Sequence, residues 1–312
     1  MSLPGSRLFH SRAITPVLRH HLPMGQLVHS QWSARRFIRY DLALRTLTAR
    51  HLLAGGTTRK NIVGWYQQMY DKRGSSENLA AFQELLKIVA AEGIDARYPV
   101  GVSKTGELLD GAQRIALALA VNEESVAVDV RRGRRLRPYG REWFRNHGFP
   151  EEALTAMDHE VDRIMATTGA DTLVVTPSTE QPLQEWLPPF LPPDSEVIRE
   201  WSISLSEKDV GELEHALKFV PIYDKGKLRE VTHQLSEGPI TIVRIRLHMP
   251  KRHRIAKTHM ATDRGVIDML RSIKAAMPDH PVVAGQTIEQ NRAAMALLQG
   301  HGWSTSVGDS WE

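Results

Sequence analysis

The sequence predicts an α+β protein in which a β-α-β core is preceded by helices and followed by a second, smaller α/β domain. Apolar residues recur at three- and four-residue steps between residues 32 and 92, which is typical of amphipathic helices. Short apolar runs flank an Ala- and Leu-rich segment within residues 95–132. After residue 195, strand-like and helix-like stretches alternate, which favours a separate α/β layer.

Composition narrows the class of protein. With 312 residues the chain can bury a full core, in one large or two modest domains. It contains no cysteine, which excludes disulfides, thiolate zinc sites and cysteine nucleophiles. No run approaches the roughly eighteen apolar residues of a membrane helix, so we expect a cytoplasmic protein with no membrane partner. The net charge of +4 suits a phosphorylated ligand or a nucleic acid but requires neither.

The first 31 residues are expected to form a basic N-terminal arm. Residues 1–40 hold six arginines and no acidic residue, together with His20, His21 and several serines. Such a composition is also typical of a mitochondrial transit segment. We prefer the interpretation as a basic, partly disordered arm that the first helix later joins, and the alternative stays open.

Four amphipathic helices are predicted, over residues 32–53, 60–72, 76–92 and 151–167. Two of them carry clear apolar stripes, formed by Leu79, Phe82, Leu86 and Val89 in the third and by Leu154, Met157, Val161 and Ile164 in the fourth. With the β-α-β segment, these helices define a first domain at residues 32–170.

Prolines indicate the domain boundary. Residues 171–195 hold a short strand at 173–176 and then six prolines, which favours a linker or an irregular covering loop. The C-terminal α/β domain is then residues 196–312. Its expected strands lie at 197–205, 240–247 and 282–285, and its expected helices at 206–219, 227–235, 263–277 and 287–299. The strand at 240–247 alternates isoleucine or valine with arginine and should be half-buried, and Thr287–Gln290 has the sequence of a capping box.

The segment Glu107–Ala120 carries the strongest functional signal. It predicts a short strand, a sharp turn at Asp110 and Gly111, and an apolar helix that Asp110 caps, with Gln113 three residues later as in a capping box. The glycine lets the backbone approach a ligand closely. Free N–H groups of the first helical turn favour an anion, which Arg114 could grip with two parallel hydrogen bonds. The turn therefore predicts a small phosphate site, and its alternative is a purely structural cap.

A strand, Asp-Gly-x-His-Arg and an Ala/Leu-rich helix mark the superfamily shared by ParB, sulfiredoxin and a group of free-amino-acid kinases. The stretch Asp110-Gly111-Ala112-Gln113-Arg114 resembles this motif. Gln113 departs from it, because the relatives usually have His there and glutamine cannot carry a proton at neutral pH. The resemblance implies a ParB/sulfiredoxin-like β-turn-β-α-β order over residues 95–132. For the kinase branch it implies that Asp110 and Arg114 lie at the phosphate-transfer site, whereas the absence of cysteine excludes sulfiredoxin chemistry itself.

Basic clusters are further candidate sites. Arg36 and Arg39 lie three residues apart on a predicted helix and could line the same cleft, or form a solvated face. The loop residues Lys251, Arg252 and Arg254 could clamp a polyphosphate, or be solvated and mobile. The run of arginines over residues 131–137 could face nucleic-acid phosphates, although such runs are usually solvated edges. The histidines lack the spacing of helical zinc ligands.

These observations favour a phosphotransferase that moves phosphate from a nucleotide to a small hydroxyl-bearing substrate, with Mg2+ and ATP or another nucleotide as cofactors. Asp110 would hold the magnesium or accept a proton from the attacking hydroxyl, while Gly111, Ala112 and Gln113 would contact the ligand. One alternative is a ParB-like nucleic-acid-binding or nucleotide-switch protein, for which residues 141–168 lack a convincing recognition-helix pair. Another is a non-catalytic phosphate-ligand binder. No Walker A or Gly-rich dinucleotide loop is present in the sequence.

Overall fold

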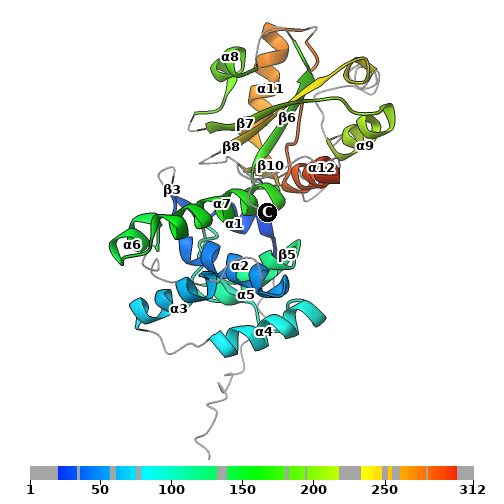
Figure 1. Ribbon diagram of the computed structural model, residues 1–312. Helices are drawn as coiled ribbons and strands as arrows, with labels where there is room; N and C mark the ends of the chain where they lie inside the picture. The colour runs from blue at the N-terminus through cyan, green and yellow to red at the C-terminus, as the bar shows by residue number, and fades with distance from the viewer. Residues whose placement is uncertain are drawn as a thin grey trace, which may run out of the picture.

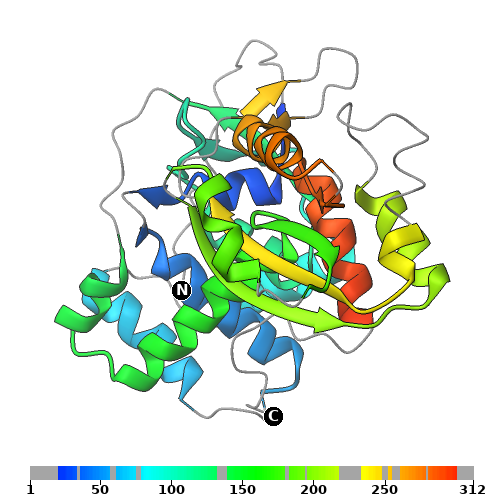
Figure 2. The ribbon, with the colours of Figure 1, turned by 90° about the horizontal axis from the view of Figure 1, so that it is seen from above.

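The protein is a mixed α and β structure, seen in a computed structural model that describes residues 20–33, 36–56, 61–74, 79–131, 139–179, 183–193, 195–217, 233–247, 252–254, 261–278 and 280–300. Its described strands form a three-stranded sheet of order β1-β5-β4, a four-stranded sheet of order β11-β6-β8-β7, and two small hairpins. Helices pack against both sheets, and α7 (Glu151–Thr167) runs between the helices near the first sheet and the strands of the second (Figure 1). Viewed from above, the second sheet lies in front of the blue and cyan helices (Figure 2).

The first sheet contains the predicted β-α-β unit. Strand β4 (Val100–Val102) runs parallel to β5 (Ser125–Val130), and α5 (Ala112–Ala120) connects them. The expected strand between β4 and α5 is reduced to a single bridge between Val102 and Leu108. Almost every apolar residue expected to be inside is buried, namely Leu108, Ile115, Leu117, Leu119 and Val128, while Leu109 is half-buried.

Residues 20–31 are part of the fold and differ from the arm expected over residues 1–31. Strand β1 (His20–Pro23) pairs antiparallel with β5, and α1 (Met24–His29) follows it directly. Met24, Leu27 and Val28 are buried in the same core as α5. The expected arm grouped this segment with the arginine-containing residues before it, whereas its first residues form a short strand at the edge of the sheet.

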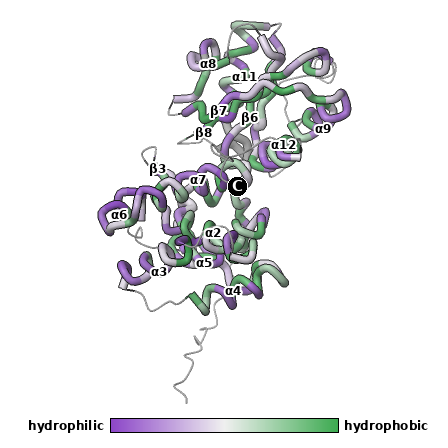
Figure 3. Tube along the Cα trace, viewed as in Figure 1, coloured by the Kyte–Doolittle hydropathy of each residue, from purple (hydrophilic) through white to green (hydrophobic). Residues whose placement is uncertain are grey.

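The first predicted helix begins later than expected. Residues from Trp32 onward form a hairpin of β2 (Trp32–Ser33) and β3 (Arg36–Phe37), and α2 runs only over Tyr40–Leu53. Helix α2 then packs against α3 (Ile62–Arg73), α5 and α7, so it lies at the centre of the first core. The predicted stripes of α4 (Leu79–Glu92) and α7 are buried, apart from Leu79 at the start of α4, which is half-buried. Helix α6 (Arg141–Asn146) buries only Phe144 and is coloured largely hydrophilic in Figure 3.

The proline-rich segment belongs to the second sheet and is not a linker over its whole predicted length. Strand β6 (Thr172–Pro177) lies inside that sheet between β11 (Val283–Ala284) and β8 (Ile240–Leu247), because its residues are apolar enough to be covered on both faces. Residues 183–190 form the short helix α8 (Leu183–Trp186) and a 3-10 turn at Pro188–Phe190. No strand therefore passes through Pro188 and Pro189, as the missing N–H groups predict.

Helices cover both faces of the second sheet. On one face, α11 (Arg264–Ala276) packs with α8, and on the other α9 (Glu207–Leu217) packs with α12 (Ile288–Gly300). The outer strand β7 (Ser195–Ile203) pairs with β8 through a register shift. The expected helix at 227–235 lies largely outside the described residues.

Of two predictions made for this part of the chain, the capping box of α12 and the half-burial of β8, only the first is confirmed. The capping box of α12 is confirmed, because Gln290 N donates to Thr287 Oγ1 at 3.1 Å and Thr287 N donates to Gln290 Oε1 at 3.2 Å. The half-buried character expected for β8 is wrong, since every residue of the strand is buried. Arg244 and Arg246 are buried because Asp162 of α7 and Asp171 pair with both of them.

Candidate functional site

The turn before α5 is fixed by backbone geometry. Leu109 N and Asp110 N both donate to the carbonyl oxygen of Gly101, at 2.8 and 3.1 Å. Gly111 then adopts a left-handed conformation with φ +88°, and Ile115 N donates to its carbonyl oxygen at 3.1 Å. A Cβ atom on Gly111 would lie 2.7 Å from Val100 Cγ1, so glycine meets both a conformational and a steric need here.

Gly111, not Asp110, is the N-terminal cap residue of α5, and no side chain caps the helix. The expectation that Asp110 caps it is therefore wrong, because the left-handed glycine moves the cap by one residue. The side chain of Asp110 is 59% exposed, and one of its oxygens lies 3.4 Å from Arg131 Nη1. The first N–H groups of this nine-residue helix, at Ala112, Gln113 and Arg114, have no intrahelical acceptor and lie at its positive end.

Part of the Arg114 guanidinium group is used in hydrogen bonds to the backbone before β4. Its Nη1 donates to the carbonyl oxygens of Tyr98 and of Pro99, the latter at 3.1 Å. Burial and the nearby Arg131 lower the pKa of Arg114, while Asp110 opposes the shift. Among the described residues, its Nε and Nη2 have no hydrogen-bond partner, so part of the guanidinium fork remains for a ligand.

Arg131 joins the site, although the sequence suggested it only as the start of an arginine run that could face nucleic-acid phosphates. Its Nε donates to Asp129 Oδ2 at 2.8 Å, and its guanidinium lies over Gly101, where a Cβ atom would be 3.1 Å from Cζ. Because β5 runs parallel to β4, the residue that follows β5 reaches the same sheet edge as the Asp110 turn. Arg131 is the first residue of the arginine run. Parallel pairing of β4 with β5 is the feature that would have predicted its position beside the turn.

Gln113 points into the protein. Its Nε2 donates to the hydroxyl of Tyr70 at 3.1 Å, and Arg45 Nε donates to the same hydroxyl, also at 3.1 Å. The predicted capping box of Asp110 and Gln113 is therefore wrong, since Gly111 is the cap residue and the amide nitrogen of Gln113 reaches Tyr70 of α3. Gln113 instead connects the turn with the buried charges behind it.

Those charges form the Asp41 cluster, which consists of Asp41, Arg39, Arg45 and Arg73. Arg39 binds both carboxylate oxygens of Asp41, at 2.8 and 3.0 Å, and Arg45 Nη1 lies 2.8 Å from Oδ2. Arg73 Nη1 is the most distant partner, at 3.4 Å. Burial alone would raise the pKa of Asp41, but the three guanidinium groups lower it well below its usual range.

Arg36 and Arg39 do not share a helix face. Both precede α2; Arg36 is exposed and pairs with Glu142 at 3.0 Å, whereas Arg39 is buried. Arg39 still reaches the candidate turn, because its Nη1 donates to the carbonyl oxygen of Leu108 at 3.0 Å. The expectation of one shared cleft is thus wrong for Arg36, while Arg39 lies directly behind the turn.

The loop arginines are only partly described. Arg252 and Arg254 lie on β9 (Arg252–Arg254), which pairs antiparallel with β10 (Ala261–Asp263) and contacts α11. Lys251 falls outside the described residues. Their expected role as a polyphosphate clamp stays a prediction.

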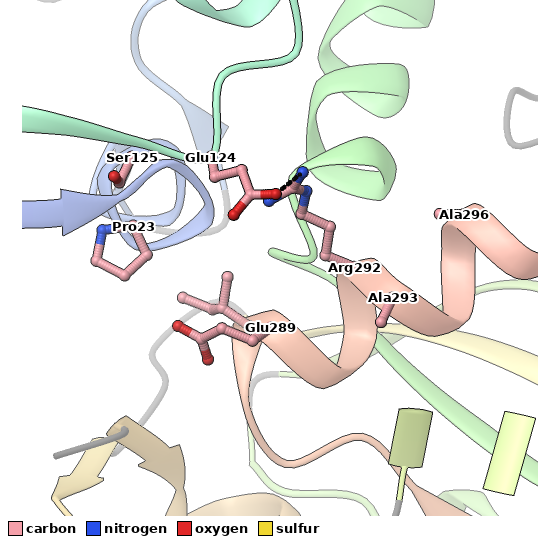
Figure 4. Close-up of a pocket in the computed structure, with 8 residues that line it drawn as sticks. Pro23, Glu124, Ser125, Glu289, Arg292, Ala293 and Ala296 are labelled. Carbon is pink, nitrogen blue, oxygen red and sulfur yellow. Dashed lines mark hydrogen bonds and ion pairs between the residues drawn. The ribbon is translucent and has the colours of Figure 1, made fainter. Parts of the chain in front are cut away.

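A pocket of about 320 Å3 lies elsewhere, between the first sheet and α12. Pro23, Glu124 and Ser125 line one side, and Glu289 and Arg292 line the other (Figure 4). Arg292 Nη2 donates to Glu124 Oε1 at 2.7 Å across it. The pocket is at the start of β5, whereas the Asp110 turn adjoins the end of that strand, so these are separate places.

Metal ligands are sparse around the turn. Within the described ranges, no group of three or more His, Asp or Glu side chains is placed to hold a metal ion. Asp110 is a single exposed carboxylate, which suits magnesium only if ligand phosphates supply further oxygens.

Comparison of this chain with protein-family models, curated proteins and solved structures finds no match. In the part of the chain that the structure describes, none of the helices combines the length and apolar character that crossing a membrane requires.

Proposed function

We propose that this protein is a ParB/sulfiredoxin-like phosphotransferase, which moves a phosphate from a nucleotide to a small hydroxyl-bearing substrate at the Asp110 turn. One observation carries the proposal: a left-handed Gly111 opens the N-terminus of α5 between Arg114 and Arg131, next to the exposed carboxylate of Asp110. Helix N-termini with flanking arginines bind phosphate through backbone N–H groups and charge-assisted bonds. In this proposal the β-α-β unit is the catalytic core, and residues after 195 form a second, smaller domain that supplies a substrate wall.

Each residue then has a defined part. The free Nε and Nη2 of Arg114 and the guanidinium of Arg131 would hold the transferred phosphate and its charge. Asp110 would bind Mg2+ together with nucleotide phosphates, or accept the proton of the attacking hydroxyl. Gln113 cannot take the proton that a histidine would, so proton transfer falls to Asp110. A nucleotide donor agrees with the cytoplasmic location expected from the sequence.

The ParB-like nucleic-acid alternative is weaker because of α7. A recognition helix must enter a DNA groove with one face exposed. Helix α6 and α7 do form a helix pair, but α7 contacts both α2 and α12 and buries nine of its residues. Of the arginine run, only Arg131 lies within the described residues.

The test is to incubate the full chain with radiolabelled ATP, Mg2+ and pools of small hydroxyl compounds. We expect magnesium-dependent transfer of label to one class of acceptor, and loss of that transfer in Asp110→Asn. DNA binding that falls steeply with salt, without any nucleotide turnover, would support the ParB-like alternative instead. ATP binding without turnover in the presence of every acceptor pool would indicate the non-catalytic binder.

A further inference from the structure

The Asp41 cluster holds more positive than negative charge. Among the residues that the structure describes, three guanidinium groups surround a single carboxylate, and Arg39 and Arg45 are almost completely buried. Among the described residues, the other hydrogen-bond acceptors of these arginines are neutral, namely the Tyr70 hydroxyl and the carbonyl oxygens of Leu108 and Asp41. Burying a charge without a counter-charge is costly, so the cluster is electrostatically prepared for an anion.

Arg73 is the member of the cluster with donors left for that anion. Its single ion pair with Asp41 is long, at 3.4 Å, and the Oδ2 atom that it contacts already accepts bonds from Arg39 and Arg45. Its Nε and Nη2 have no hydrogen-bond partner among the residues that the structure describes. The side chain is 20% exposed, and Tyr139 holds its guanidinium in place at 4.2 Å from the ring centroid.

The cluster contacts the chain leading into the Asp110 turn directly through Arg39, and it is linked to Gln113 through the hydroxyl of Tyr70. Arg39 binds the carbonyl oxygen of Leu108, and Arg45 shares the Tyr70 hydroxyl with Gln113 of α5. The N-terminus of α5 therefore has cations on two sides: Arg114 and Arg131 near the sheet edge, and the Asp41 cluster beyond Gln113.

We infer that Arg73 binds a second phosphate group of the ligand whose first phosphate lies at the Asp110 turn, so that the ligand class is a diphosphate or triphosphate. This inference rests on the proposed function, since it assumes a phosphate at the turn. The two unused N–H groups of Arg73 form the fork that two phosphate oxygens accept. A ligand with one phosphate would leave Arg73 unused, whereas one with two neutralises both sets of cations.

The experiment compares inorganic orthophosphate and pyrophosphate by calorimetric titration of the full chain at constant ionic strength. We expect the parent to bind pyrophosphate at least about tenfold more tightly than orthophosphate. Arg73→Ala should remove most of that advantage while its orthophosphate affinity changes less than about twofold. Arg73→Lys should recover part of it, because it keeps the charge but not the fork. Arg271→Ala is the matched control, since Arg271 is an exposed arginine on α11 and should bind both probes like the parent.

The outcomes separate the two proposals. If Arg114→Ala loses orthophosphate binding while Arg73→Ala keeps the full pyrophosphate advantage, the turn is a phosphate site and the role of Arg73 is refuted. If Arg73→Ala loses pyrophosphate while Arg114→Ala binds both probes normally, the cluster binds an anion and the site proposed at the turn is wrong. A parent that binds neither probe refutes both. Arg73→Lys must have the same melting temperature as the parent, so that misfolding is excluded as the cause of any pyrophosphate affinity that it loses.

Discussion

Arg39 Nη1 donates a hydrogen bond to the carbonyl oxygen of Leu108, 3.0 Å away, across a separation of 69 residues. The bond joins the segment before α2 to the chain that leads into Asp110. Since Arg39 is itself held by both oxygens of Asp41, the position of the candidate turn depends on a buried carboxylate that no ligand would touch.

Asp41→Asn should therefore destabilise the protein strongly. The amide leaves buried arginines without their carboxylate, and breaking a buried ion pair on one side costs about 3–5 kcal/mol. Urea denaturation should show a much lower midpoint than for the parent. Glu84→Gln is the control, because Glu84 forms an exposed pair with Lys87 and should change stability by less than about 1 kcal/mol. Equal midpoints for the two variants would mean that the cluster is not a structural centre.

Stability should fall in acid through the same carboxylates. Guanidinium partners outweigh burial and lower the pKa of Asp41 and of Asp162. A folded-state pKa below the unfolded value of about 3.9 gives stabilisation that is present above that value and is lost as the pH falls through the folded pKa. The free energy of unfolding should thus decrease progressively below about pH 4. In Asp41→Asn this decrease should be shallower, and an unchanged acid slope would contradict the assignment.

Gly111→Ala should lower stability and weaken ligand binding together. A left-handed conformation costs a residue with a Cβ about 1–2 kcal/mol, and the contact with Val100 adds to that cost. Gly211→Ala is a matched control, because Gly211 lies within α9 with no atom within 4 Å of its added Cβ. It should stabilise the protein by about 0.5–1 kcal/mol. Thermal melts test both predictions: the melting temperature should fall in Gly111→Ala and rise in Gly211→Ala.

Arg114→Ala should lose ATP binding and retain the fold. A charge-assisted contact contributes about 1.5–3 kcal/mol, so affinity should drop about ten- to a hundredfold, with partial recovery in Arg114→Lys. The variant also loses the bonds to Tyr98 and Pro99, so its melting temperature should fall slightly. A variant that binds and turns over ATP like the parent would place the phosphate site elsewhere.

Asp110→Asn should separate binding from turnover. The carboxylate is exposed and makes one long contact with Arg131, so its removal should change stability by less than about 1 kcal/mol. Nucleotide affinity should survive better than the transfer rate, because the amide cannot hold Mg2+ as firmly or accept a proton. Measured values of kcat and Kd decide this: equal losses in both would argue against a catalytic role.

Local pattern was sufficient for much of the fold. The stripes over α4 and α7 predicted which residues are inside, because helical period alone determines the buried face. The capping box of α12 depends on residues three apart, and it was predicted. The apolar helix α5 was also predicted from its own residues, whereas the β-turn-β-α-β order around it was implied by the resemblance and is observed without a full second strand. The stripes, the capping box and the helix α5 itself need no knowledge of distant parts of the chain.

Long-range pairing accounts for what the sequence did not predict. His20–Pro23 was assigned to the basic arm from its neighbours in the sequence, but it forms a strand because it pairs with β5. The alternation in β8 predicted that Arg244 and Arg246 face solvent. They are buried instead, because Asp162 and Asp171 provide their counter-charges. At the site, Arg131 reaches the turn only because two strands run parallel, and the left-handed φ of Gly111 decides which residue caps α5.

The pairing of Asp162 and Asp171 with the arginines of β8 bears on how this chain could be divided. Arg246 also lies over the ring of Trp32, at 5.1 Å from its centroid. A cut near residue 170 would leave two buried arginines in one fragment and Asp162, with Trp32, in the other. Each fragment would then lack part of the buried charge network. The proline-rich stretch is therefore a poor place to divide the protein for separate expression, and the two halves are best produced as one polypeptide.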